Sequence, residues 1–167
     1  MLASRRSYSR IGILVLMIVS FMACKKNMAE NDDLGIYNIN VNLVPVDLKN
    51  MTYASGFIKF RQDPDTNRII TLDTYIVNLL PNHDYLLQRA VNPITDAGCT
   101  STSWLTLGLG LVAQSIHTDA KGNGHETLFR DITAIARGTE FRIHFQIIDA
   151  TTLNPVLNSD CEQYTVR

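Results

Sequence analysis

The residues with the most potential for chemistry surround one glycine-rich turn. His117 and His125 flank residues 119–124, and Asp119 and Glu126 lie close by in the sequence. Imidazole and carboxylate groups bind transition metals, which need three or four such ligands at fixed geometry. Neither H-x-H nor H-E-x-x-H occurs in the chain. We therefore expect solvated turn residues and no metal, with His117, His125 and Asp119 as the candidate ligands if a hairpin brings the histidines together.

A second candidate metal site is the run Asp63-x-Asp65-x-Asn67, which has the opening spacing of a calcium loop. An EF-hand loop also requires glycine at its sixth position and an acid at its twelfth. Those positions hold Arg68 and Thr74. The run therefore predicts an ordinary hairpin loop.

A third motif, Gly108-x-Gly110-x-x-Ala113, matches the dinucleotide-binding pattern. That fingerprint requires a following helix within a βαβ unit, whereas residues 115–118 lead into a turn. The segment therefore predicts an apolar loop. No G-x-S-x-G, P-loop or catalytic cysteine signature occurs either. We expect a protein that is not an enzyme and holds no tightly bound metal or cofactor.

Composition bounds the class of protein. The chain has 167 residues, of which 46% are hydrophobic and 19% charged, and its net charge is −1. This is enough for one domain with a core, and it excludes wholesale disorder. A nucleic-acid-binding protein would show a basic patch or stripe, so no nucleic acid partner is expected.

The first 23 residues have the layout of a secretory signal. Arg5, Arg6 and Arg10 form a positive region, and residues 11–21 form an apolar run of 11 residues. A helix that spans a bilayer needs about 20 apolar residues, so this run is too short to be a membrane anchor by itself.

The end of that segment, Phe21-Met22-Ala23-Cys24, resembles the lipobox of bacterial lipoproteins. The resemblance implies that residues 1–23 are removed and that Cys24 is lipidated and anchors the protein to a membrane. Two or more acyl chains give stable anchoring, because each buried CH₂ contributes about 0.8 kcal/mol. The alternative is a signal in which Cys24 is incidental.

Residues 24–33 are polar and lack periodicity, which predicts the lipidated cysteine followed by a flexible tether. The layout resembles lipoproteins of the Bacteroidetes. Lys25 occupies the place where aspartate retains enteric lipoproteins in the inner membrane, which favours the outer membrane. Acidic residues at positions 30, 32 and 33 are compatible with display on the cell surface.

With Cys24 set aside, two cysteines are left, Cys99 and Cys161. An exported chain with two remaining cysteines has one possible disulfide, and the exported compartment is oxidising. We expect a Cys99–Cys161 disulfide rather than a zinc site built on two cysteines.

Residues 34–167 are expected to form a single β domain. In residues 36–46 apolar and polar side chains alternate with period two, and the alternation returns in residues 141–147. This pattern is typical of a strand with one buried face. Other β-rich runs are separated by turn residues, and residues 131–137 allow one helical turn or a link. About eight or nine short strands predict an antiparallel β-sandwich.

Residues 79–85 (Leu-Leu-Pro-Asn-His-Asp-Tyr) resemble the L-x-P-x-x-x-Y tyrosine corner of fibronectin type III and other immunoglobulin-like domains. Residues 118–122 resemble the T-D-x-x-G turn of bacterial surface β-sandwich modules. The resemblance implies an immunoglobulin-like sandwich in which Pro81 and Tyr85 form the corner and the Tyr85 hydroxyl bonds to nearby backbone. The chain continues for 82 residues after Tyr85, so a larger or rearranged sandwich is expected.

These observations favour a non-enzymatic, membrane-anchored envelope lipoprotein that binds a protein or glycan partner. Binding is expected from a surface patch rather than a pocket, with Arg142, His144 and Gln146 on the polar face of one strand as candidates. Two alternatives stay open. One is a subunit of a fimbrial or other envelope assembly, and the other is a metal-binding or dismutase-like enzyme built on His117 and His125.

The lipobox leads to a direct test. When the full chain is expressed with a labelled fatty acid, it should incorporate the label at Cys24 and lose residues 1–23. The Cys24→Ser variant should incorporate none, because the thiol that accepts the lipid is gone. Equal labelling of both proteins, measured on gels and by mass spectrometry, would contradict the assignment.

Overall fold

The computed structural model of the chain describes residues 36–47, 49, 53–64 and 67–167. These residues belong to one compact unit, residues 31–167. The expected signal at 1–23, the lipidation site Cys24 and the tether at 24–33 lie outside the described residues. Within the described part of the chain, no helix is long and apolar enough to cross a membrane.

The described part is all-β, as the sequence predicted, with twelve strands and no helix. The strands are β1 (Tyr37–Pro45), β2 (Ser55–Gln62), β3 (Ile69–Val77), β4 (Asp84–Pro93), β5 (Leu105–Thr106), β6 (Gly108–Leu109), β7 (Val112–Ala113), β8 (Ser115–His117), β9 (Gly124–Asp131), β10 (Glu140–Asp149), β11 (Pro155–Ser159) and β12 (Glu162–Thr165). The count exceeds the expected eight or nine partly because the segment expected to be an apolar loop forms the small hairpin β6–β7. Residues 132–139 form turns that link β9 to β10.

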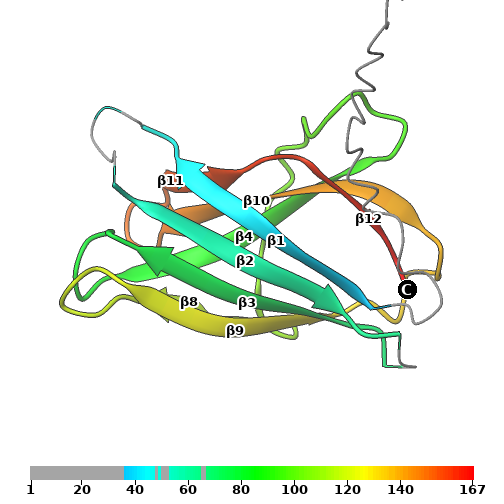
Figure 1. Ribbon diagram of the computed structural model, residues 1–167, viewed down its shortest axis with the longest axis horizontal. Helices are drawn as coiled ribbons and strands as arrows, with labels where there is room; N and C mark the ends of the chain where they lie inside the picture. The colour runs from blue at the N-terminus through cyan, green and yellow to red at the C-terminus, as the bar shows by residue number, and fades with distance from the viewer. Residues whose placement is uncertain (1–35, 48, 50–52, 65–66) are drawn as a thin grey trace, which may run out of the picture. The chain divides into compact units, whose positions relative to one another are not determined.

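Hydrogen bonding joins all twelve strands into one sheet, in the order β5-β4-β10-β11-β1-β2-β3-β9-β6-β7, with β12 also on β10 and β8 on β4. Every pairing is antiparallel except β6 with β9. A sandwich would have two separate sheets. Here β11 pairs with both β10 and β1, so the strands form one continuous sheet. The sheet closes through β8, which pairs with β4 and continues through a Thr118–Gly124 bridge to β9 (Figure 1).

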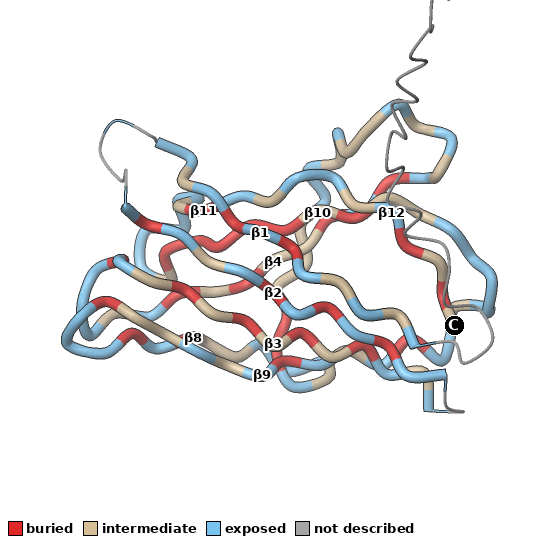
Figure 2. The backbone as a smooth tube through the Cα atoms, viewed as in Figure 1, coloured by how far each residue is buried: buried red, intermediate tan, exposed pale blue. Residues whose placement is uncertain are grey.

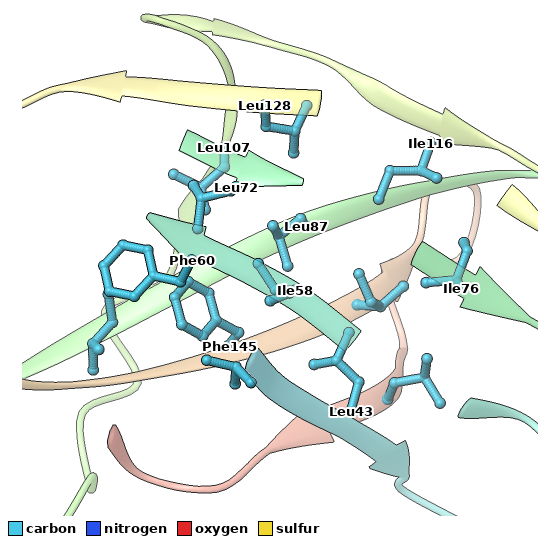
Figure 3. Packing of buried hydrophobic residues seen from close by; sticks show 14 of the residues in the cluster. Leu43, Ile58, Phe60, Leu72, Ile76, Leu87, Leu107, Ile116, Leu128 and Phe145 are labelled. Atoms are coloured by element: carbon cyan, nitrogen blue, oxygen red, sulfur yellow. The ribbon is translucent and has the colours of Figure 1, made fainter. Parts of the chain in front are cut away.

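The core lies between the inward faces of the strands. Along β3 the buried residues alternate with more exposed ones, at Ile70, Leu72, Thr74 and Ile76. Figure 2 shows the same alternation of buried and exposed residues along other strands. Side chains from strands that are not hydrogen-bonded neighbours, such as Ile58 of β2 and Leu87 of β4, turn toward one another in Figure 3. The apolar side chains that alternate with period two in the sequence therefore fill one hydrophobic core.

The tyrosine-corner residues form a close turn between β3 and β4. Tyr85 is only 1% exposed, and the Leu80 amide donates a hydrogen bond to its hydroxyl over 3.0 Å. This is the contact that the corner motif led us to expect. The pKa of Tyr85 is raised, chiefly because the phenol is buried.

The corner is bound to the second motif, the Thr118–Gly122 turn. The Thr118 side chain is fully buried; its hydroxyl donates to the Leu80 carbonyl over 2.6 Å and accepts from the His83 amide over 3.0 Å. The Leu79 amide donates to the Gly122 carbonyl over 3.0 Å. Two motifs that lie more than 30 residues apart therefore form one hydrogen-bonded unit.

The segment between β4 and β5 is tied down on the outside of the sheet. Cys99 forms the expected disulfide with Cys161, which lies between β11 and β12. The buried Asn92 side chain donates to Asp96 and Thr100 and accepts from the backbone amide of Ser101. This segment is therefore held against the sheet by covalent and polar contacts together.

Two glycines allow a matched test of the corner. Gly122 and Gly138 both have positive φ, at 79° and 77°. A Cβ at Gly122 would lie 2.1 Å from the Leu79 carbonyl oxygen, whereas a Cβ at Gly138 would meet nothing within 4 Å. Gly138→Ala should therefore cost only the left-handed backbone penalty, roughly 1–2 kcal/mol. Gly122→Ala should cost clearly more, because the corner must also move. Denaturant unfolding measures both, and equal losses would refute the role given to the corner.

Candidate functional site

The candidate metal ligands are not brought together. His117 contacts Asp84 over 2.9 Å, whereas His125 contacts Asp73 on β3. The Asp119 carboxylate accepts backbone amides of its own turn, which lowers its pKa. Among the residues that the structure describes, no group of three or more His, Cys, Asp or Glu side chains could hold a metal ion. The hairpin places the histidines on neighbouring strands, but each turns to a different carboxylate.

The other two histidines have structural partners of their own. The His83 Nε2 lies 2.8 Å from a carboxylate oxygen of Asp149. The His144 Nε2 lies 3.1 Å from the Ser101 carbonyl oxygen, and its ring packs on Trp104. Burial lowers the pKa of His144. Both histidines therefore fasten one segment of the fold to another.

The row Arg142, His144 and Gln146 is not the open binding face that the sequence suggested. The Arg142 Nε donates to the Asp96 carbonyl over 2.9 Å, His144 contacts Ser101, and Gln146 is only 8% exposed. The Gln146 amide donates to a glutamine of β4 over 2.7 Å. The reason is the disulfide-tied segment after β4, which lies over this face of β10. The alternation of period two correctly predicts which side chains of the strand point away from the core. It cannot show whether a segment distant in the sequence covers those side chains.

The calcium-like run is likewise an ordinary connection in its described residues. Asp63 pairs with Arg61 of β2 over 3.6 Å. Asp65, the second candidate ligand, lies outside the described residues.

The most developed candidate site is a cavity of about 360 Å³ that is partly open to solvent. It lies inside the sheet at the end opposite the corner, where β4 finishes and β10 begins. Its wall is largely apolar and includes Phe60, Leu72, Leu107, Phe141 and Phe145. Three charged side chains also line it, at Arg89, Arg130 and Glu140.

The two arginines occupy positions that the strand pattern assigns to the core. Along β4, Arg89 follows Tyr85 and Leu87 at the period of two, and both of those side chains are buried. Along β9, Arg130 follows Leu128, which is also buried. Side chains two residues apart share one face of a strand, so both guanidinium groups point toward the cavity.

The electrostatics of the cavity are unbalanced. No hydrogen bond or ion pair joins the Arg89 side chain to any residue that the structure describes, and its pKa is lowered by burial and then by the charge of Arg130. The Arg130 Nη1 donates to the Gly110 carbonyl over 3.2 Å. Glu140 is exposed, and its carboxylate accepts a long hydrogen bond from Thr165. Two cations therefore share an apolar site in which the lining acid pairs with neither of them.

Sequence reasoning missed this site because it treated binding as a property of surface patches. The signal was present in the alternation: an arginine stands in the apolar phase of each of two strands, at positions 89 and 130. The alternation does not show which distant strands pair, and it is this pairing that places the two arginine side chains in one cavity.

Comparison of the chain with protein-family models, with curated proteins and with solved structures found no match.

The pair formed by the half-buried His83 and the buried Asp149 predicts a pH dependence of stability. The pKa of Asp149 is lowered, first by its hydrogen bond from the Thr152 amide. A carboxyl group with a lowered folded-state pKa stabilises the fold above its ordinary pKa, and that contribution is lost as the pH falls through the folded value. Asp149→Asn should therefore flatten the acid side of the stability curve.

Denaturant unfolding between about pH 7 and pH 3 measures this effect. Asp84→Asn is the matched control, because Asp84 also contacts a histidine but the pair is exposed and screened by water. A parallel fall in the free energy of unfolding for the wild type and Asp149→Asn would contradict the prediction.

Proposed function

We propose that this chain is a non-enzymatic, membrane-anchored binding module and that it holds a small, largely apolar molecule in the cavity between its layers. The observation that carries the proposal is the cavity itself. Its volume of about 360 Å³ falls within the range of roughly 300–1,000 Å³ typical of ligand sites. Its lining of aliphatic and aromatic side chains with a few charged groups is also typical of such sites.

The form of the cavity supports the same proposal. It is partly open to solvent, so a ligand has a way in, and its lining exposes mainly apolar side chains. A ligand that covers these side chains removes apolar surface from water, which favours binding.

The anchor proposed from the sequence fits this function. A lipid on Cys24 and the polar segment 24–33 would tether the domain to a membrane surface. We propose the outer membrane as that surface. A domain in this position meets apolar and amphiphilic molecules of the envelope at high local concentration.

We further propose that the fold is a modified immunoglobulin-like sandwich. One layer would contain β1, β2, β3 and β9, and the other β4, β10 and β12, with β11 between them. The Tyr85–Leu80 hydrogen bond supports this, because it lies where the chain passes from β3 in one layer to β4 in the other. The modification is the continuous hydrogen bonding through β11 and β1.

Filling the cavity tests the proposed function. Val91 lines the cavity near the end of β4 and is 36% exposed, so Val91→Trp should occupy the space without replacing a fully buried core residue. The probe is decanol, followed through the labelled methyl groups of Leu107, Ile132 and Ile143. The protein is the full chain carrying Cys24→Ser, which keeps the lipid anchor out of the assay.

Decanol should shift the cavity methyl resonances, and Val91→Trp should weaken its binding at least tenfold because the space is taken. Val44→Trp is the control, since Val44 lies on β1, is 54% exposed and does not line the cavity. If neither decanol nor a charged decyl compound shifts these methyl groups, the cavity is not a ligand site and the proposed function fails.

A further inference from the structure

We propose that the ligand of this cavity is an anionic amphiphile of the fatty-acid type, with its carboxylate between Arg89 and Arg130 and its alkyl chain against the apolar wall. The inference deepens the proposed function and rests on it, because it names the class of molecule that the same cavity takes. It follows from the position, the missing partners and the surroundings of the two arginines.

The first step is the cost of placing arginine on an inward face. Arginine is almost never buried unless it is paired with an acid or another acceptor. Arg89 is half-buried, stands one strand period beyond the fully buried Leu87, and has no hydrogen bond or ion pair within the described residues. Its guanidinium group offers five N–H donors, and these are open to an acceptor that enters the cavity.

The second step is the neighbouring charge. Arg130 lines the same cavity, and the repulsion between the two cations adds to the cost of burial for Arg89. One anion placed between them offsets both terms, and the planar guanidinium fork matches a carboxylate geometrically. Glu140 does not supply this anion, because it is exposed and contacts Thr165 instead.

The rest of the cavity wall is apolar, and this determines the second part of the ligand. Away from the arginines the cavity is lined by apolar side chains, among them Phe60, Ile70, Leu72 and Phe145. A small hydrophilic anion would satisfy the arginines and leave this wall unfilled. A neutral apolar molecule would fill the wall and leave the arginine donors without water or partner, which is costly. A molecule with one anionic end and an alkyl chain satisfies both parts.

The test compares three ligands that share one alkyl chain: decanoate, decanol and decylammonium. Each is titrated into the full chain carrying Cys24→Ser, with the cavity methyl resonances as the readout. Decanoate should bind at least tenfold more tightly than decanol, which corresponds to about 1.4 kcal/mol, and decylammonium should bind least tightly. The order is expected because only decanoate supplies a charged acceptor to the two guanidinium groups.

Arginine variants inside and outside the cavity distinguish the effect of a charge in the cavity from the effect of the net charge of the protein. Arg89→Gln should abolish the preference for decanoate over decanol, whereas Arg89→Lys, which keeps a cation, should retain part of it. Arg61→Gln removes the same charge from an exposed arginine of β2 outside the cavity, and it should leave the preference unchanged. Arg130→Gln provides a second site if Arg89→Gln fails to fold.

The outcomes are distinct. If decanol binds as tightly as decanoate, or if Arg89→Gln and Arg130→Gln both leave the preference intact, the anionic class is wrong while the cavity remains a ligand site. If decylammonium binds best, the class is also wrong. If none of the three ligands shifts the cavity methyl groups, the proposed function fails together with this inference.

Discussion

The hydrogen-bonded corner constrains the geometry of the whole sheet. Thr118, fully buried, connects the β3–β4 turn to the β8–β9 turn through the Leu80 carbonyl and the His83 amide. Because of this connection β8 lies between β4 and β9 and pairs or contacts both. The sheet is therefore closed at one end by polar contacts, which include the hydrogen bond to the buried phenol of Tyr85.

The cavity is the consequence at the other end. There, in the described part of the chain, the short strands β5 and β6 pair with β4 and β9, and Leu107 lies between them in the sequence. The inward side chains change along the strands in the same direction, from Tyr85 and Leu87 to Arg89. A charged side chain on an inward face prevents the layers from packing tightly, since guanidinium groups keep water or a ligand around them. The sheet is therefore closed at the end that holds the corner, and the cavity opens at the end that holds the two arginines.

The local features of this fold could be predicted from the sequence, because they depend on near neighbours. Period-two alternation identified the long strands, and counting cysteines identified the Cys99–Cys161 disulfide. The features that could not be predicted depend on distant segments. The pairing of β11 with β1 joins the expected layers into one sheet, and no local pattern encodes that register. In the same way the segment after β4 covers His144, although the strand pattern correctly assigns that residue to the outer face.

The covered outer face of β10 supports one wall of the candidate site. On β10 the residues of one phase, Phe141 and Phe145 among them, line the cavity. The residues of the other phase, Arg142 and His144, bind the segment that the disulfide holds in place. One strand is therefore held on its outer face by the side chains that the sequence suggested for binding, and its inner face forms part of the cavity wall. A wall fixed in this way loses little conformational freedom when a ligand enters, which is how preorganisation raises affinity.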